Sequence, residues 1–240
     1  MRTVGGAVQG PRLRATIAAV VHIGMTRALA VYDLDGTILD GDSHAILLAE
    51  LVLRSGASAR ARVDIALGGV AWALGLVDDD HTKATAAGAL AGMTAAQIRA
   101  WAEPLLARAV LPRVRPAMAA RVERDREAGF ATLLLSASLD DVVAAVARSL
   151  RFDHAAGTRL AYDGGRATGR IDGEALRGEE KAHYLARFAR SHGVDLSRSR
   201  AYGDRVSDAP LLSLVGEPFA VHPDRGLRRI ARLRGWPVLT

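Results

Sequence analysis

Short, continuous apolar runs recur along the chain and predict buried strands. The first covers residues 28–32 and is followed by a turn that contains glycine, as is typical of a strand covered on both faces. Later runs of the same kind lie at residues 130–135, 152–158, 200–203 and 217–221. Helical patterns separate them, at residues 140–150, 178–192 and 208–215. This alternation predicts an α/β protein built on a doubly wound parallel sheet.

The stretch after the first strand has a different character. Residues 44–114 carry helical periodicity without a convincing strand, so we expect a helical insertion there. Thr94 and Gln97 fit a capping box at the start of its last helix. The helices of this region are predicted at residues 43–54, 59–77, 82–90 and 94–110. The insertion leaves residues 27–43 and 115–240 as the predicted core.

Three further elements are expected in the core. The first is a helix at residues 115–128, which Gly129 would end. The second is a β-hairpin that turns at residues 163–165. The third is an amphipathic helix at residues 225–234.

The start of the chain allows two interpretations. Arginines followed by an apolar stretch at residues 15–23 faintly resemble a signal peptide, with a candidate cleavage site at residues 28–30. Cleavage there would remove most of the first strand, so we interpret residues 1–26 as a disordered extension. Translation from Met25 stays an alternative, in which residues 1–24 are not made.

Composition narrows the classes of function. The chain has no cysteine, which excludes disulfides, thiol nucleophiles and cysteine-ligated metals and suits a cytoplasmic protein. No stretch approaches the roughly 20 apolar residues of a membrane helix, so we predict no stable membrane span. The net charge is +6, but arginines alternate with acids at residues 121–127 and aromatic residues make up only 5% of the chain. We therefore predict no nucleic-acid partner.

Two carboxylates follow the first strand directly. Asp33 and Asp35 are one residue apart, just past the carboxyl end of a strand, where open α/β sheets bind ligands. Since an Asp-Gly pair is also a common turn, this segment alone leaves a polar turn and a ligand site as equal alternatives. A divalent cation between the two acids would remove their mutual repulsion.

Other polar groups are predicted at the same edge of the sheet. The carboxyl ends of parallel strands meet there, so residues that end separate strands should converge with Asp33 and Asp35. These further groups are a hydroxyl, an ammonium and two carboxyls, from Ser136, Lys181, Asp204 and Asp208. Only Lys83 and Lys181 are lysines among 32 basic residues, which favours a function for Lys181 over a surface role.

Together these groups fit phosphoryl transfer from a monoester. We expect Asp35 to protonate the leaving alkoxide and then to deprotonate the water that hydrolyses the phosphorylated nucleophile. Mg²⁺ is the expected cofactor, because it offsets the repulsion between a phosphate and a carboxylate. Its expected ligands are Asp33, Asp204 and Asp208. Lys181 would neutralise further charge, and Ser136 would donate a hydrogen bond to a phosphoryl oxygen.

The hydroxyl at the end of the second strand has a structural alternative. Ser136 is also placed to cap the helix at residues 140–150. Ser138, which fits a capping box with Asp141, is the better candidate for the cap. If Ser138 caps the helix, Ser136 is left for the substrate.

In order and spacing, these groups match four motifs of the haloacid dehalogenase-like (HAD) superfamily, which the chain resembles. The motifs are residues 33–37, Ser136, Lys181 and residues 203–208. The helical insertion resembles a C1-type cap, and the segment before Lys181 resembles subfamily IB, which includes phosphoserine phosphatase-like enzymes. The resemblance implies a Rossmann-like core, Mg²⁺ dependence, Asp33 as nucleophile and Asp35 as general acid/base. It also implies that the backbone carbonyl of Asp35 is a metal ligand.

The substrate is framed by the same resemblance. It implies a small phosphorylated metabolite, phosphoserine-like among others, with Thr37 among the substrate-binding residues. Asp42 matches, by charge only, a glutamate with which phosphoserine phosphatases read an amine. A phospholipid head group is an alternative substrate.

One residue departs from the family pattern. Arg205 stands where related enzymes have a small residue, so a catalytically weak, phosphate-binding relative is the other alternative. A response-regulator receiver also uses aspartate, Mg²⁺ and lysine, but the length of this chain does not suit one. The oligomeric state is not predicted.

Overall fold

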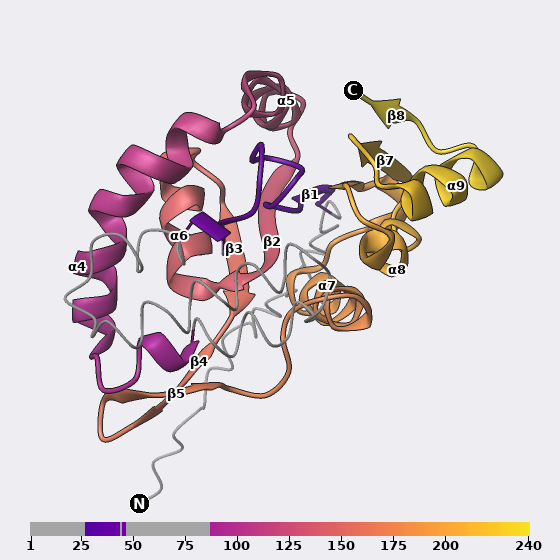
Figure 1. Ribbon diagram of the computed structural model, residues 1–240. Helices are drawn as coiled ribbons and strands as arrows, with labels where there is room; N and C mark the ends of the chain where they lie inside the picture. Colours follow the sequence, from indigo (N-terminus) through magenta and orange to yellow (C-terminus); the bar gives the residue numbers. More distant parts are fainter. Residues whose placement is uncertain (1–26, 44, 47–86) are drawn as a thin grey trace, which may run out of the picture.

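The computed structural model describes residues 27–43, 45–46 and 87–240 (Figure 1). The expected extension at residues 1–26 lies outside the described residues. So do the helices predicted at residues 59–77 and most of those at 43–54 and 82–90.

Six strands form the central sheet, in the order β3-β2-β1-β6-β7-β8. Every neighbouring pair in it is parallel. The strands are β1 (Leu29–Tyr32), β2 (Ala131–Leu139), β3 (His154–Thr158), β6 (Arg200–Gly203), β7 (Glu217–Val221) and β8 (Val238–Leu239). The chain reverses its direction of travel across the sheet at β1, between β2 and β6, and this is the point where doubly wound sheets bind ligands. The predicted fold class is confirmed.

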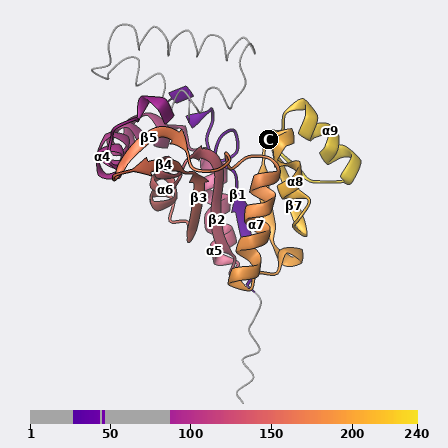
Figure 2. The same ribbon diagram turned by 90° about the horizontal axis from the view of Figure 1, so that it is seen from below.

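Helices cover both faces of this sheet (Figure 2). Leu29 and Val31 belong to a buried cluster with residues of α7 (Glu179–His192), α8 (Ala209–Leu212) and α9 (Arg225–Arg234). Ala30 and Tyr32 point the other way, into a cluster with α5 (Pro116–Glu127) and α6 (Asp140–Ser149). A strand buried on both faces needs apolar side chains at every position, which explains the continuous run that predicted β1. Within the described part of the chain, no helix is long and apolar enough to cross a membrane.

The helix expected at residues 94–110 is present but changes its form along its length. It begins as α4 (Ala95–Leu105), with the predicted capping box of Thr94 and Gln97 confirmed. It continues as the π-helical segment η1 (Leu106–Val110) and the 3₁₀ segment η2 (Leu111–Arg113). Pro104 and Pro112 lie in this stretch and lack a backbone N–H, so a regular α-helical ladder cannot run through it.

The predicted hairpin is confirmed and forms a second, two-stranded sheet. β4 (Leu160–Asp163) pairs antiparallel with β5 (Arg166–Ile171). Gly164 and Gly165 both have positive φ, as a tight two-residue hairpin turn requires. The backbone of Ala167 exchanges hydrogen bonds of 2.8 Å with Gly92 and Met93, so the hairpin packs against the segment before α4.

Three boundaries differ from the prediction. β2 runs on to Leu139 instead of ending at residue 135, because its polar end pairs with β3 through Leu139 and Thr158. The helix predicted at residues 208–215 is a 3₁₀ turn, η4 (Val206–Asp208), followed by the single turn α8. β8 was not predicted, since a two-residue strand leaves no pattern in the sequence.

A buried polar cluster ties the centre of the sheet to α5. Tyr32 of β1 and Tyr202 of β6 stack with ring centroids 4.3 Å apart. Both hydroxyls donate to the Asp125 carboxylate, at 2.5 and 2.8 Å. Arg200 donates to the other oxygen of Asp125 at 2.6 Å. These contacts hold β1 and β6 in place immediately before Asp33 and Asp204.

Candidate active site

Asp33 lies at the carboxyl end of β1, in the middle of the sheet. Its backbone N–H donates to the carbonyl of Tyr202 at 3.0 Å, which extends the ladder between β1 and β6 by one residue. The residue is buried, with 5% of its surface exposed. A carboxylate in that position must find an internal partner or a ligand, because burial removes its hydration.

That internal partner is Lys181, on the first turn of α7. Its Nζ donates to Asp33 Oδ1 at 2.5 Å and to Asp208 Oδ1 at 2.8 Å. Burial by itself would lower the pKa of Lys181, but the neighbouring carboxylates of Asp208 and Asp33 outweigh it, so the pKa is raised. Lys181 therefore stays charged, and its ammonium group links Asp33, at the end of β1, to Asp208 of η4.

Asp204 and Asp208 complete an acidic cluster with Asp33. Carboxylate oxygens of the three residues lie within 4.8 Å of one another. Asp204 follows β6 and its side chain packs directly on Gly36, where an added Cβ would come within 2.1 Å of Asp204 Oδ2. Gly36 also has φ of 77°, so both its conformation and its neighbour require glycine. The turn after Asp35 is thus shaped around the Asp204 carboxylate.

The electrostatics of this cluster are unfavourable without a further cation. Burial raises the pKa of Asp33 well above its usual range. The positive charge of Lys181 lowers this pKa, but the nearby acids raise it further. Burial, with the Asp208 carboxylate next, raises the pKa of Asp204 to about 7. One oxygen of Asp204, Oδ1, is buried and has no hydrogen-bond partner among the described residues. A hard divalent cation fits this cluster of carboxylates, since it prefers carboxylate oxygens and would bind the unpartnered Oδ1 of Asp204.

Asp35 lies beside the cluster and is held by hydroxyl and backbone donors. The backbone N–H of Ser43 donates to Asp35 Oδ1 at 2.7 Å, and the Ser43 hydroxyl reaches Oδ2 at 3.1 Å. Ser138 Oγ donates to the same Oδ2 at 2.7 Å, and the two serine hydroxyls lie 2.6 Å apart. Three donors from two segments therefore fix the orientation of this carboxylate.

The expectation that Ser138 caps α6 is wrong. The residue before α6 is Leu139, and no side chain caps that helix. Ser138 still belongs to β2, and its buried side chain faces Asp35 instead of the helix start. The capping pattern misled because β2 continues past the serines. The signal available in the sequence was the alternation of Ser136 and Ser138, which places both side chains on one face of an extended strand.

Ser136 and Thr37 are both buried, and the contacts of their hydroxyl oxygens differ. Ser136 Oγ accepts from the backbone N–H of Ser138 at 3.1 Å, and among the described residues its own proton has no acceptor. Thr37 Oγ1 is buried and has no hydrogen-bond partner among the described residues. Neither Ser136 nor Thr37 caps a helix, so both hydroxyl groups can bind an external ligand.

Asp42 lies in the segment after β1 and already has partners. Its Oδ1 accepts from the backbone N–H of Ala45 at 3.1 Å, in the manner of a helix cap. Its Oδ2 lies 3.7 Å from Arg205 Nη2, and Arg205 Nε lies 3.9 Å from Asp204 Oδ2. Arg205 thus bridges the predicted amine-binding acid and one acid of the cluster.

Comparison with known proteins gives this arrangement its context. A family model described as haloacid dehalogenase-like hydrolase matches residues 30–213, which include every residue of the cluster. The chain belongs to this family. A protein of Mycobacterium tuberculosis named as a probable phosphatase is 31% identical over 217 residues, covering 89% of this chain and 75% of the relative. The predicted family and the predicted class of enzyme, a phosphatase, agree with these findings.

Two solved structures extend the comparison. A protein of unknown function from Bordetella pertussis is 31% identical, with a TM-score of 0.79 over 90% of this chain and 99% of that one. A substrate-bound phosphoserine phosphatase has a TM-score of 0.65 at 18% identity, over 89% of this chain and 93% of that one. The similarity to the phosphoserine phosphatase is one of fold, so the architecture of this chain is phosphoserine phosphatase-like.

Proposed function

We infer that this HAD hydrolase is a Mg²⁺-dependent phosphomonoesterase that works through an aspartyl-phosphate on Asp33. The observation that carries the inference is the convergence of Asp33, Asp204 and Asp208 around Lys181, with carboxylate oxygens within 4.8 Å of one another. A phosphate monoester is the substrate class that needs both a nucleophilic carboxylate and surplus positive charge beside it.

Asp33, Asp204 and Asp208 would hold the metal, with the backbone carbonyl of Asp35 as a further ligand implied by the family. Bound Mg²⁺ supplies charge neutralisation and orientation of the phosphate oxygens. Lys181 adds a fixed positive charge on the side of α7, and it keeps Asp33 Oδ1 directed by a hydrogen bond.

In the first step, an Asp33 oxygen attacks phosphorus and the bond between phosphorus and the ester oxygen breaks. The electron pair of that bond goes to the ester oxygen, and Asp35 supplies the proton that turns the leaving alkoxide into an alcohol. The donors of Ser43 and Ser138 keep the Asp35 carboxyl group pointed in one direction while it does so. Ser136 and Thr37 would form hydrogen bonds with phosphoryl oxygens.

In the second step, water attacks the phosphorus of the aspartyl-phosphate. Asp35, now a carboxylate, takes a proton from the water, and the bond between phosphorus and the Asp33 oxygen breaks. Inorganic phosphate leaves, Asp33 is again a carboxylate and Asp35 is again protonated, so the cycle closes. One acid serves both steps because the first step leaves it in the state that the second step needs.

The proposed substrate is a small phosphorylated metabolite in the cytoplasm, with phosphoserine-like compounds among the candidates. Asp42 would contact a substrate amine. Because Arg205 also lies beside Asp42, the carboxylate would have to bind the amine and the guanidinium together. Because Arg205 also lies 3.9 Å from Asp204, a catalytically weak phosphate-binding protein is the second candidate function. Tight phosphate binding without turnover on any ester would favour that candidate.

Asp33→Asn tests the proposal directly. Hydrolysis of p-nitrophenyl phosphate in the presence of Mg²⁺ should fall on the order of a thousandfold or more, since the nucleophile is lost. Asp163→Asn, at an exposed acid that ends β4, is the matched control and should keep wild-type activity. Full activity of Asp33→Asn would rule out this residue as the nucleophile.

A further inference from the structure

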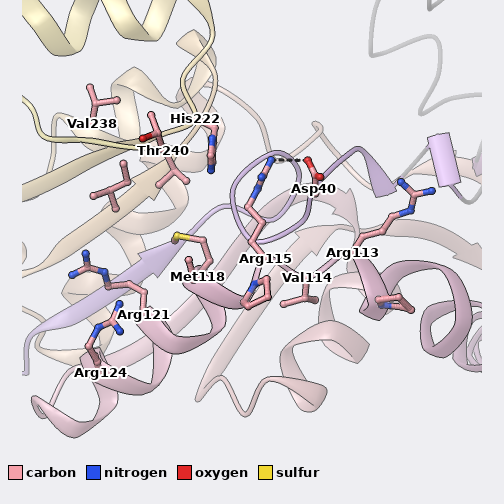
Figure 3. A pocket seen from close by; sticks show the side chains of 15 residues that line it. Asp40, Arg113, Val114, Arg115, Met118, Arg121, Arg124, His222, Val238 and Thr240 are labelled. Carbon is pink, nitrogen blue, oxygen red and sulfur yellow. Dashed lines mark hydrogen bonds and ion pairs between the residues drawn. The ribbon is translucent and has the colours of Figure 1, made fainter.

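A concave site lies beside the loop that follows β1 (Figure 3). It is a cavity of about 880 Å³, lined by the start of α5, the end of β7 and β8, with Asp40 at its rim. None of Asp33, Asp35, Ser136, Lys181, Asp204 or Asp208 lines it. We call it the arginine cleft. Its volume lies within the range of sites that hold small molecules.

Positive charge dominates the lining of the arginine cleft. Four arginines line it, together with His222. They are Arg113, Arg115, Arg121 and Arg124. Asp40 is the one acidic side chain among the lining residues. A concave surface with this balance attracts anions, because low-dielectric walls focus the field of the charges.

Arg121 and Arg124 are available to a ligand. They are three residues apart on α5, so they lie on one side of the helix, and both line the cleft. No acid in the described part of the chain forms an ion pair with either. The Arg121 guanidinium lies over the ring of Phe219, 5.7 Å from its centroid, which uses the face of the group and leaves its N–H edges free to donate.

Arg115 links the arginine cleft to the loop after β1. Its Nη2 donates to Asp40 Oδ1 at 2.8 Å (Figure 3). Its Nε is buried and has no hydrogen-bond partner among the described residues, and such a group has a need for an acceptor. Asp40 lies at the exposed rim, so it neutralises only part of the charge inside.

The remaining wall of the cleft is apolar and narrows the kind of ligand. Met118, Val221 and Leu239 line it beside the arginines. His222 follows Val221 and has φ of 40°, a left-handed conformation that is energetically costly for residues other than glycine. A 2.8 Å hydrogen bond from its N–H to the Leu239 carbonyl holds this conformation. The apolar side chains and the guanidinium donors line the same cavity, so the cleft suits a ligand that has both an apolar body and an anionic end.

We propose that the arginine cleft binds a small organic phosphate, with its phosphate group on Arg121 and Arg124 and its apolar part against Met118 and Leu239. The planar guanidinium forks match the oxygens of a phosphate group and can bind it through paired hydrogen bonds. The site is separate from the acidic cluster, and its occupancy does not depend on turnover.

Phenylphosphonate is a suitable probe, because its carbon–phosphorus bond resists hydrolysis and it carries an apolar ring. The full chain is titrated by calorimetry without divalent cations, when the acidic cluster repels a dianion and the cleft does not. We expect the wild-type protein to bind one equivalent. The variant Arg121→Gln/Arg124→Gln should bind about tenfold more weakly or worse, since two charged hydrogen-bond donors are lost.

A matched variant separates site binding from the loss of net charge. Arg228→Gln/Arg229→Gln removes the same charge from an exposed part of α9, away from the cleft, and should bind the probe like the wild type. Circular dichroism should show the fold of both variants to be intact. Absence of binding to the wild-type protein would overturn the proposal. So would equal losses in both double variants or unchanged binding after Arg121→Gln/Arg124→Gln.

Phosphatase activity gives an independent second readout. Both double variants should hydrolyse p-nitrophenyl phosphate at wild-type rates if the cleft is separate from the catalytic centre. A protein that bound the probe in the cleft but hydrolysed no ester would contradict the proposed function and leave the cleft proposal standing. Loss of hydrolysis in the Arg121→Gln/Arg124→Gln variant alone would contradict the separation of the two sites.

Discussion

Asp125, which is buried, and Asp204, which is partly buried, are both acids next to the central strands, and they differ in the hydrogen-bond partners of their oxygens. Asp125 accepts hydrogen bonds from Tyr32, Tyr202 and Arg200, so both of its oxygens have donors. Asp204 lies among other acids, and its Oδ1 has no partner in the described part of the chain. A buried carboxylate with fixed donors belongs to the architecture, whereas one with an orphaned oxygen beside further acids is prepared for a ligand.

The neighbouring groups follow the same division. Burial raises the pKa of the Tyr32 hydroxyl, and Tyr202 and Asp125 raise it further, so it remains a donor to Asp125. Around Asp204, the acids instead raise one another's tendency to hold a proton. The first site is complete as folded, and the second gains from a bound cation.

The largest effect in this comparison is expected from Asp125→Ala. The free energy of unfolding should fall on the order of 3 kcal/mol, because two buried hydroxyls and Arg200 lose their acceptor. Urea denaturation of the metal-free protein measures it. Asp204→Ala should cost far less in the same experiment, since it removes a repulsive charge. Equal losses in the two variants would erase the distinction between the sites.

The next effect is stabilisation by Mg²⁺. At about 100 times its dissociation constant, Mg²⁺ should add about 2.7 kcal/mol to the free energy of unfolding of the wild-type protein. Asp204→Asn should lose most of this gain, while Asp163→Asn should keep it. Thermal unfolding with and without Mg²⁺ is the measurement. The idea fails if Mg²⁺ stabilises Asp204→Asn as much as the wild type.

A smaller effect is expected from pH in the absence of divalent cations. The pKa of Asp204 is about 7 in the folded protein, against an ordinary value of 3.8. Between those values the folded state binds more protons than the unfolded state, so its stability is highest at the acidic end and falls as the pH rises towards 7. The melting temperature should therefore drop by a few degrees between pH 5 and 7. Asp204→Asn should show a shallower drop, and an identical profile would contradict the assignment.

The smallest effect is expected from Ser138→Ala. Loss of one of the donors that orient Asp35 should lower kcat on p-nitrophenyl phosphate about tenfold and leave KM nearly unchanged. Ser149→Ala, at an exposed position of α6, serves as the control. A change in KM alone would assign Ser138 to substrate binding instead of to the orientation of Asp35.

Much of the fold followed from local patterns. The apolar runs of β1, β6 and β7 predicted buried strands because a strand covered on both faces carries no polar alternation. The capping box of Thr94 and Gln97 and the glycines of the hairpin turn also act within a few residues. The prediction ended β2 too early, because Ser136 and Ser138 resemble the end of a strand. In the structure, pairing with β3 extends β2 to Leu139.

Residue type and strand position are local properties, so the chemical groups of the site and the strand ends that carry them could be predicted from the amino-acid order. The folded chain was needed to learn which of these groups meet. Ser138 and Asp35 are 103 residues apart, and Lys181 and Asp33 are 148 apart. The missing partner of Asp204, the hydroxyl donors of Asp35 and the arginine cleft all depend on such distant contacts, and no local periodicity encodes the distance between two side chains.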